Sequence, residues 1–290
     1  MSESRTVAQV IAEHQEAGKF IQVDGIKTFV LDQGEGEAVF CIHGVPTSSF
    51  LYRKVINSLA DKGMRGICID LPGLGLSDRP EDFEYTFHSF ARFCARAAEV
   101  LGLKQYHLLI HDIGGPVGFA LAAENKAKIL SLNILNTWID VDTFKKPLPM
   151  RPFEMPVLGE AELKTIIHPT WHLLFSNMGV IDANPIPDEE IYAYVDLLKR
   201  EDGGAAFLKI MRSFQKSEEF KRLCYEAVEN VAYPIQAIWG AEDPALDFAH
   251  YGNQIKAAAN LQEVHKLASR HFLQEEKPEE IAALIVGLKK

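Results

Sequence analysis

Apolar and polar positions along the chain follow two patterns, one typical of buried strands and one typical of helices. Short, nearly continuous apolar runs predict strands buried on both faces, at residues 39–42, 66–69, 107–110, 129–135 and 235–239, with a weaker one at 263–267. Helical spacing of apolar residues predicts helices at 52–62, 88–101, 118–124, 248–259 and 278–288. Strands that alternate with helices form right-handed βαβ units, so we expect a mostly parallel, eight-stranded sheet covered on both faces.

Two regions depart from this alternation. Near the N-terminus, a polar helix at 7–17 precedes two alternating strands, 20–23 and 27–32, that predict an antiparallel pair. After Trp138 the strand pattern stops, and seven prolines between 147 and 187 accompany helical stretches around 160–175, 188–200, 204–214 and 217–228. We therefore predict an α/β core formed by 1–138 and 229–290, with a helical cap inserted at 139–228.

Composition and charge narrow the class of protein. The 290 residues are 47% hydrophobic and 24% charged, as in an ordinary globular protein. A net charge of −10 argues against nucleic acid or anionic membrane as partner. Neither a secretory signal nor an apolar run of about 18 residues is present in the sequence, and the four widely spaced cysteines favour free thiols in a cytoplasmic protein. We expect a monomer or homodimer that binds a small molecule and water, with no cofactor and no metal.

The run at 107–110 ends abruptly in His111-Asp112-Ile113-Gly114-Gly115, just before a helical stretch. A sharp turn from strand to helix exposes the residue at its corner above the sheet, and that residue is usually serine. Here it is Asp112. A carboxylate attacks well at a saturated carbon that carries a leaving group, and poorly at an ester carbonyl. The reaction class therefore depends on this residue.

A nucleophilic Asp112 needs a general base, because an alkyl ester on its carboxylate can be released only by hydrolysis. His271, in a loop before the last helix, is the candidate base. Asp243, just past the strand at 235–239, is the candidate acid that fixes the imidazole, with Glu242 as its rival. The backbone N–H groups of Val45 and Ile113 are the expected oxyanion donors.

Five motifs occur in an order that spans the whole predicted core. They are His43-Gly-Val-Pro-Thr-Ser-Ser, Asp70-Leu-Pro-Gly-Leu-Gly-Leu-Ser-Asp, His111-Asp-Ile-Gly-Gly, Trp239-Gly-Ala-Glu-Asp and His271-Phe-Leu-Gln-Glu. In this combination the chain resembles the α/β-hydrolase superfamily, in the branch of haloalkane dehalogenases and epoxide hydrolases. The resemblance implies a triad of Asp112, His271 and Asp243. In this family the acid can instead follow the sixth strand, but Asn136 holds that place here, which supports Asp243.

The chain differs from haloalkane dehalogenases in the residues that would contact the leaving group. Haloalkane dehalogenases usually have tryptophan directly after the nucleophile, where this chain has Ile113, and many have asparagine where it has Val45. Both usual side-chain donors to a halide are therefore missing beside the nucleophile. Trp138 or Trp171 could replace them, although the sequence does not place either indole.

Epoxide hydrolases instead use a cap tyrosine or histidine that hydrogen-bonds the epoxide oxygen. His172 on the first cap helix resembles that donor, and Tyr192 or Tyr194 could be a second one. Hydrolysis of a small, largely apolar epoxide is thus our first hypothesis. Hydrolysis of a carbon–halogen bond is the second, and a hydrolase-fold binding protein without turnover is the third.

Overall fold

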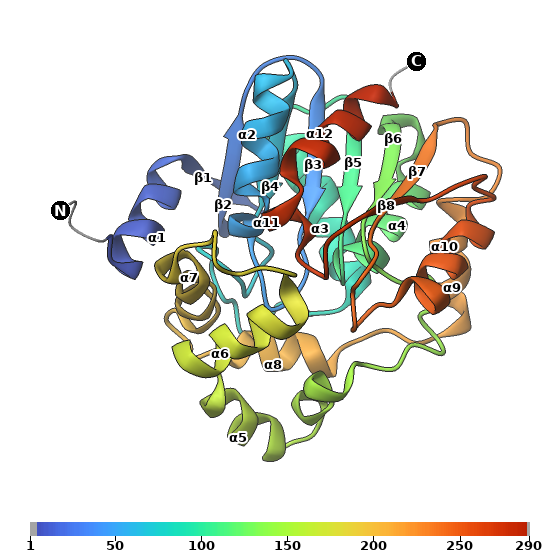
Figure 1. Ribbon diagram of the computed structural model, residues 1–290. Helices are drawn as coiled ribbons and strands as arrows, with labels where there is room; N and C mark the ends of the chain where they lie inside the picture. Colours follow the sequence, from blue (N-terminus) through green and yellow to red (C-terminus); the bar gives the residue numbers. More distant parts are fainter. Residues whose placement is uncertain (1–4, 289–290) are drawn as a thin grey trace.

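The computed structural model describes residues 5–288 as a twisted eight-stranded sheet with helices on both faces (Figure 1). The strands lie in the order β1-β2-β4-β3-β5-β6-β7-β8. Pairings β1–β2 and β2–β4 are antiparallel and the other five are parallel. This confirms the predicted α/β-hydrolase architecture. The strands are β1 (Gly18–Val23), β2 (Ile26–Gln33), β3 (Ala38–Ile42), β4 (Arg65–Ile69), β5 (Tyr106–Ile110), β6 (Ile129–Ile134), β7 (Ile235–Gly240) and β8 (His265–Leu267).

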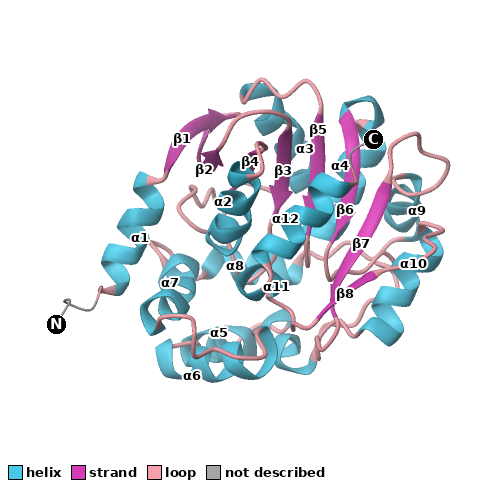
Figure 2. Ribbon diagram, turned by 45° about the horizontal axis from the view of Figure 1, so that its top comes forward, coloured by secondary structure: helices cyan, strands magenta, loops and turns pink. Residues whose placement is uncertain are grey.

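Helices cover both faces of the sheet, as parallel strands require. On one face α2 (Arg53–Asp61) packs against α12 (Pro278–Gly287), and on the other α3 (Phe87–Val100) packs against α4 (Gly114–Glu124) (Figure 2). Every residue of β3 and β5 is consequently buried. The other helices of this region are α1 (Val7–Glu16), α10 (Asn253–Ala258), α11 (Leu273–Glu276), the 3-10 helices η1 (Ser49–Tyr52) and η2 (Lys126–Lys128), and the π-helix η5 (Phe248–Gly252).

The inserted segment forms a group of helices at one end of the sheet, which we call the cap helices (Figures 1 and 2). They are α5 (Leu158–Thr165), α6 (His168–Leu174), α7 (Asp188–Lys199) and α8 (Ala205–Arg212), joined by η3 (Leu148–Glu154) and the π-helix η4 (Phe175–Gly179). We expected one helix over 160–175, but the structure has two. Pro169 lacks an N–H and fits only the first turn of a helix, so a new helix begins at His168.

The last helix of the inserted segment, α9 (Glu218–Glu226), packs against α4 of the core. It therefore covers the sheet, although it follows the cap helices in the sequence. The four cysteines are buried free thiols. Within residues 5–288, none of the helices has the length and hydropathy needed to cross a bilayer.

Candidate active site

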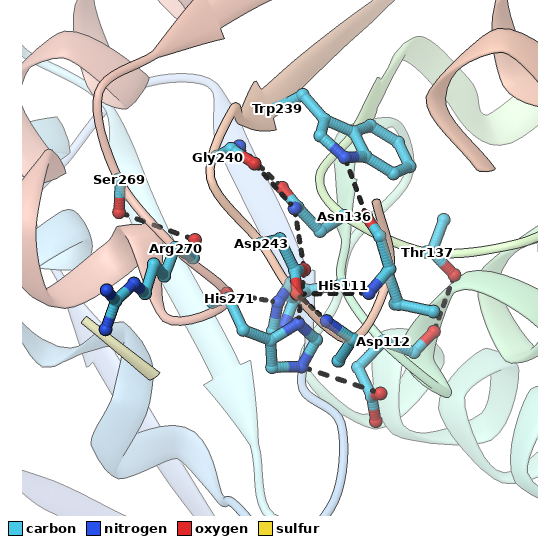
Figure 3. A network of polar contacts seen from close by, with 12 residues as sticks. His111, Asp112, Asn136, Thr137, Trp239, Gly240, Asp243, Ser269, Arg270 and His271 are labelled. Carbon is cyan, nitrogen blue, oxygen red and sulfur yellow. Dashed lines mark hydrogen bonds and ion pairs between the residues drawn. The ribbon is translucent and has the colours of Figure 1, made fainter. Parts of the chain in front are cut away.

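The turn between β5 and α4 holds Asp112 in a strained conformation, with a φ of 54° in the left-handed region that side chains rarely adopt. Two bonds from the chain after β6 fix it there: Asp112 N–H donates to Asn136 O at 2.9 Å, and Thr137 Oγ1 donates to Asp112 O at 2.6 Å (Figure 3). A Cβ at Gly115 would collide with the Thr137 hydroxyl, which explains the glycine. The carboxylate thus stands at the end of the sheet.

His271 and Asp243 meet beside this turn, as Figure 3 shows. His271 Nδ1 lies 2.8 Å from Asp243 Oδ2, and Nε2 lies 3.7 Å from Asp112 Oδ2. Since a carboxylate only accepts hydrogen bonds, Nδ1 carries the proton in the neutral ring and Nε2 is left free to accept one. The three predicted triad residues are therefore brought together by the ends of β5 and β7 and the loop after β8.

Asn136 is a residue of this site that sequence reasoning treated only as an unsuitable acid. Its Nδ2 donates to Asp243 Oδ2 at 2.8 Å, and its Oδ1 accepts the Gly240 N–H at 2.7 Å. The other oxygen, Asp243 Oδ1, accepts the backbone N–H groups of Ala245 and Leu246 at 2.7 and 3.0 Å. Asp243 is thus a buried carboxylate whose two oxygens are both satisfied, which fixes the direction in which it holds the histidine.

Burial and neighbouring charge shift the pKa values of the triad in opposing ways. Burial raises the pKa of Asp112, and the nearby His271 and the Val45 and Ile113 N–H groups offset only part of this rise. Burial would lower the pKa of His271, but the Asp243 and Asp112 carboxylates together outweigh burial and raise that pKa above its usual value. For Asp243, burial is outweighed by His271 together with the Leu246 and Ala245 N–H groups, and its pKa falls below the usual value. The Asp243–His271 contact therefore favours the charged form of each side chain.

The two oxygens of Asp112 have different surroundings. Oδ1 accepts the Val45 N–H at 2.9 Å, in the loop after β3. Oδ2 faces His271 Nε2 at a separation longer than a hydrogen bond. One oxygen is therefore held by a backbone donor, as an oxyanion would be, while the other is free to form a bond.

Asp112 and His271 lie in the wall of a cavity of about 240 Å³ between the sheet and the cap helices. The wall is largely apolar and aromatic. Its members include Val45, Ile113, Trp138, Phe144, Met150, Phe153, Ile166, Trp171, Leu174, Phe175, Phe207, Met211, Phe214 and Phe272. Such a wall suits a small, largely apolar ligand. Within the described residues, no group of three or more His, Cys, Asp or Glu side chains is arranged to hold a metal ion.

Two of the three tryptophans line this cavity and carry an unused donor. The indole Nε1 atoms of Trp138 and Trp171 are buried and have no hydrogen-bond partner within residues 5–288, although both side chains are at most 3% exposed. Trp239, in β7, instead donates to Leu246 O at 3.0 Å. Buried donors are normally paired, so a ligand that accepts hydrogen bonds is one partner that could satisfy these two indoles.

The other two predicted substrate-binding residues lie elsewhere. His172 is on the outer side of α6, about one third exposed, with Nε2 3.2 Å from Asp188 Oδ1. Tyr194 is buried in α7, where its hydroxyl donates to Glu275 Oε1 and its ring stacks on Phe272. Neither residue, both predicted to contact the substrate, is among those that line the cavity, and both side chains are engaged with protein partners.

The loop that carries His271 is also tied to the segment after α6. Arg270 Nη1 donates to the carbonyls of Ser176, Asn177 and Val180 at 2.9 to 3.0 Å. Phe272 N–H donates to Gly179 O at 2.7 Å. The base of the triad is therefore positioned from both the sheet and the cap side.

A mostly parallel sheet in this order, with a carboxylate at the β5–α4 turn, a histidine and a second carboxylate, defines an α/β-type hydrolase. A family model described as the alpha/beta hydrolase fold matches residues 37–278. Haloalkane dehalogenase 1 of Mycobacterium bovis is 30% identical over 254 residues, which cover 84% of this chain and 81% of that protein.

Solved structures agree on the fold. Cfl2 from Burkholderia cenocepacia aligns with a TM-score of 0.81 at 23% identity, covering 94% of this chain and 95% of its own. Epoxide hydrolase VrEH1 from Vigna radiata aligns with a TM-score of 0.73 at 22% identity, covering 93% and 96%. The chain therefore belongs to the α/β-hydrolase fold family, in the branch of haloalkane dehalogenases and epoxide hydrolases, and it is a hydrolase.

Proposed function

We propose that this hydrolase cleaves a carbon–halogen bond in a small, largely apolar substrate, through an alkyl ester on Asp112. The observation that carries the proposal is that two residues lining the nucleophile's cavity, Trp138 and Trp171, each have a buried indole N–H without a partner within residues 5–288. Trp138 follows Thr137, which bonds the nucleophile's own backbone. The ring centroid of Trp171 lies 6.3 Å from that of Phe272, next to the base. One donor comes from the core and one from the cap.

In the first step, a lone pair on Asp112 Oδ2 attacks the carbon that bears the halogen. The carbon–oxygen bond forms as the carbon–halogen bond breaks, and the halide leaves with the bonding electrons. The indole N–H groups of Trp138 and Trp171 stabilise the charge that develops on it. No proton is transferred, because a halide is a weak base.

In the second step, His271 Nε2 takes a proton from water, and the hydroxide attacks Asp112 Cγ. The charge that develops on Oδ1 is stabilised by the backbone N–H groups of Val45 and Ile113. Collapse of this intermediate breaks the bond between Cγ and Oδ2, and the alcohol leaves with Oδ2 and the proton from His271. Asp243 stabilises the imidazolium between these transfers.

The leaving group distinguishes this proposal from epoxide hydrolysis, our first hypothesis from the sequence. Opening an epoxide produces an alkoxide, which needs an acidic donor such as a tyrosine hydroxyl. Within residues 5–288 no tyrosine lines the cavity. His172, the donor that favoured that hypothesis, and Tyr194, a candidate second donor, are bonded elsewhere. An indole N–H donates a hydrogen bond but is not an acid, so it suits a halide.

The test is to trap the ester. His271→Gln removes the base that hydrolyses it, while His250→Gln, at an exposed histidine in η5, serves as the matched control. Each variant is incubated with short bromoalkanes, chloroalkanes and the corresponding epoxides, and its intact mass and the released halide are measured. We expect His271→Gln to gain one alkyl group at Asp112 from the halides, with one equivalent of halide released. Adducts from epoxides alone would contradict the proposal.

A further inference from the structure

A lysine lies in the wall of the otherwise apolar cavity. Lys146 follows Trp138 and Phe144 along the chain, is 3% exposed and contributes to the wall that also holds Asp112. A buried ammonium is costly unless it is paired, so its place in a substrate cavity calls for an explanation. The triad and the leaving-group donors do not use it.

The protein supplies hydrogen-bond partners for only part of this ammonium. Lys146 Nζ donates to Glu154 Oε1 at 2.5 Å and lies 3.6 Å from the centre of the Phe214 ring. An ammonium has three N–H donors, and within residues 5–288 the bond to Glu154 is its only hydrogen bond. Burial and the nearby Lys216 charge together lower the pKa of Lys146 more than Glu154 raises it.

Glu154 is itself shared between two cations. Lys216 Nζ lies 3.7 Å from the same Glu154 Oε1, and the Glu154 side chain is 37% exposed. One carboxylate thus serves two ammonium groups, which leaves an excess positive charge at this end of the cavity. A second carboxylate brought by a ligand would balance it.

A series of stacked rings connects the nucleophile with this lysine. Trp138, next to the residue that bonds the Asp112 backbone, stacks on Phe144 with ring centroids 3.7 Å apart and planes 6° apart. Both rings stack on Phe214, at 6.1 and 6.3 Å, and Phe214 carries the ammonium on its face. A substrate lying along these rings would have its reacting carbon at Asp112 and its other end at Lys146.

We propose that Lys146 binds a carboxylate at the far end of the substrate, so that the preferred substrates are halogenated carboxylic acids. This inference rests on the proposed function for the reacting end of the substrate and adds a binding site for the other end. Besides Asp112, Glu162 on α5 is the one acidic side chain in the described wall, and it would favour a cationic end instead. A preference for substrates with an anionic end would therefore support a site at Lys146, and a preference for a cationic end would support one at Glu162.

The experiment compares ω-bromo acids, amides and amines of matched chain length by kcat/KM, in the native protein and in three variants. Lys146→Met removes the charge, and Lys146→Arg keeps it. Lys216→Met removes the other cation at Glu154, from a residue outside the wall. One charge-assisted hydrogen bond predicts that the native protein prefers the acid over the amide by roughly ten- to a hundredfold. This preference should disappear in Lys146→Met and largely return in Lys146→Arg. It should weaken but remain in Lys216→Met, because Glu154 then balances Lys146 alone.

A binding measurement separates this inference from the proposed reaction. Alkanoic acids without halogen are titrated against intrinsic fluorescence, since Trp138 and Trp171 line the cavity. If no halide is turned over but the acids bind more weakly to Lys146→Met than to Lys216→Met, the proposed function fails and the carboxylate site stands. Equal use of acid and amide by the native protein, or a preference for the amine, would overturn the site.

Discussion

Removing the two unpaired indole donors should slow carbon–halogen cleavage without unfolding the protein. Trp138→Phe and Trp171→Phe each delete one N–H and keep most of the ring. A hydrogen bond to a charged acceptor contributes roughly 1.5–3 kcal/mol, so each change should slow alkylation of Asp112 by about ten- to 150-fold. The loss should be larger for chloride than for iodide, because the smaller ion holds its charge more tightly.

The third tryptophan provides the matched control. Trp239 is buried like the other two, but its N–H is already paired with Leu246 O. Trp239→Phe therefore leaves a buried carbonyl without its donor, at a cost of roughly 1–3 kcal/mol in the free energy of unfolding, added to the lost packing. Trp138→Phe and Trp171→Phe lose packing but remove an orphan donor, so they should destabilise less. We expect Trp239→Phe to lower the stability most and the rate of alkylation least, and the two cavity variants to do the reverse.

The assay is rapid-quench measurement of halide release in a single turnover, together with urea unfolding of each variant. Bromide titration by fluorescence provides an independent readout of the anion site. If both cavity variants alkylate within about twofold of the native rate, or if Trp239→Phe slows alkylation as much as they do, the indoles are not the leaving-group site.

Three further predictions follow from the site and its supports. Since the pKa of His271 is raised and only the neutral ring accepts a proton, ester hydrolysis should fail as pH falls through that pKa. Alkylation should fail only where the Asp112 carboxylate, whose own pKa is raised by burial, becomes protonated. The ester should then accumulate at mildly acidic pH, as seen by mass after acid quench. Gly44→Ala would place a Cβ against the Asp112 carboxylate and should reduce turnover about a hundredfold in steady-state assays. Glu275→Gln removes the buried carboxylate that pairs with the half-buried Arg53 and should lower the free energy of unfolding by about 3–5 kcal/mol in urea titrations.

Each prediction has its contradiction. Loss of alkylation and hydrolysis at the same pH would mean that one group governs both steps. Gly287→Ala, where an added Cβ meets open space, should be neutral, and an equal loss there would refute the steric argument. Glu13→Gln removes an exposed partner of Arg5 and should cost less than about 1 kcal/mol. A cost for Glu275→Gln no greater than this would show that its buried pair adds little.

The sequence predicts the core well because its signals are local. Continuous apolar runs identify the buried strands, and the change from strand to glycine-flanked turn identifies Asp112. The resemblance then assigned Asp243 and His271 to the loops after the last strands. The structure brings these three residues together as expected. Their spacing in sequence says little about distance, but the ends of parallel strands meet at one edge of a sheet.

The cap side is harder to predict, for a physical reason. Successive residues on a helix point about 100° apart, so Trp171 and His172 cannot both face the cavity. Which one does so depends on how α6 packs, and the sequence of α6 does not contain that information. Tyr194 is placed by Glu275, a partner far along the chain. Lys146 lies in a loop without periodicity, where nothing local indicates burial.

The heavy-oxygen content of Asp112 after a single turnover tests the covalent mechanism most directly. Excess native enzyme is allowed to consume a bromoalkane in water labelled with heavy oxygen, and both the alcohol and the Asp112 peptide are weighed. The two-step account predicts unlabelled alcohol and one heavy oxygen in the carboxylate, because the alcohol leaves with Oδ2. Labelled alcohol and an unlabelled Asp112 would mean that water attacks the substrate directly, and would contradict the account.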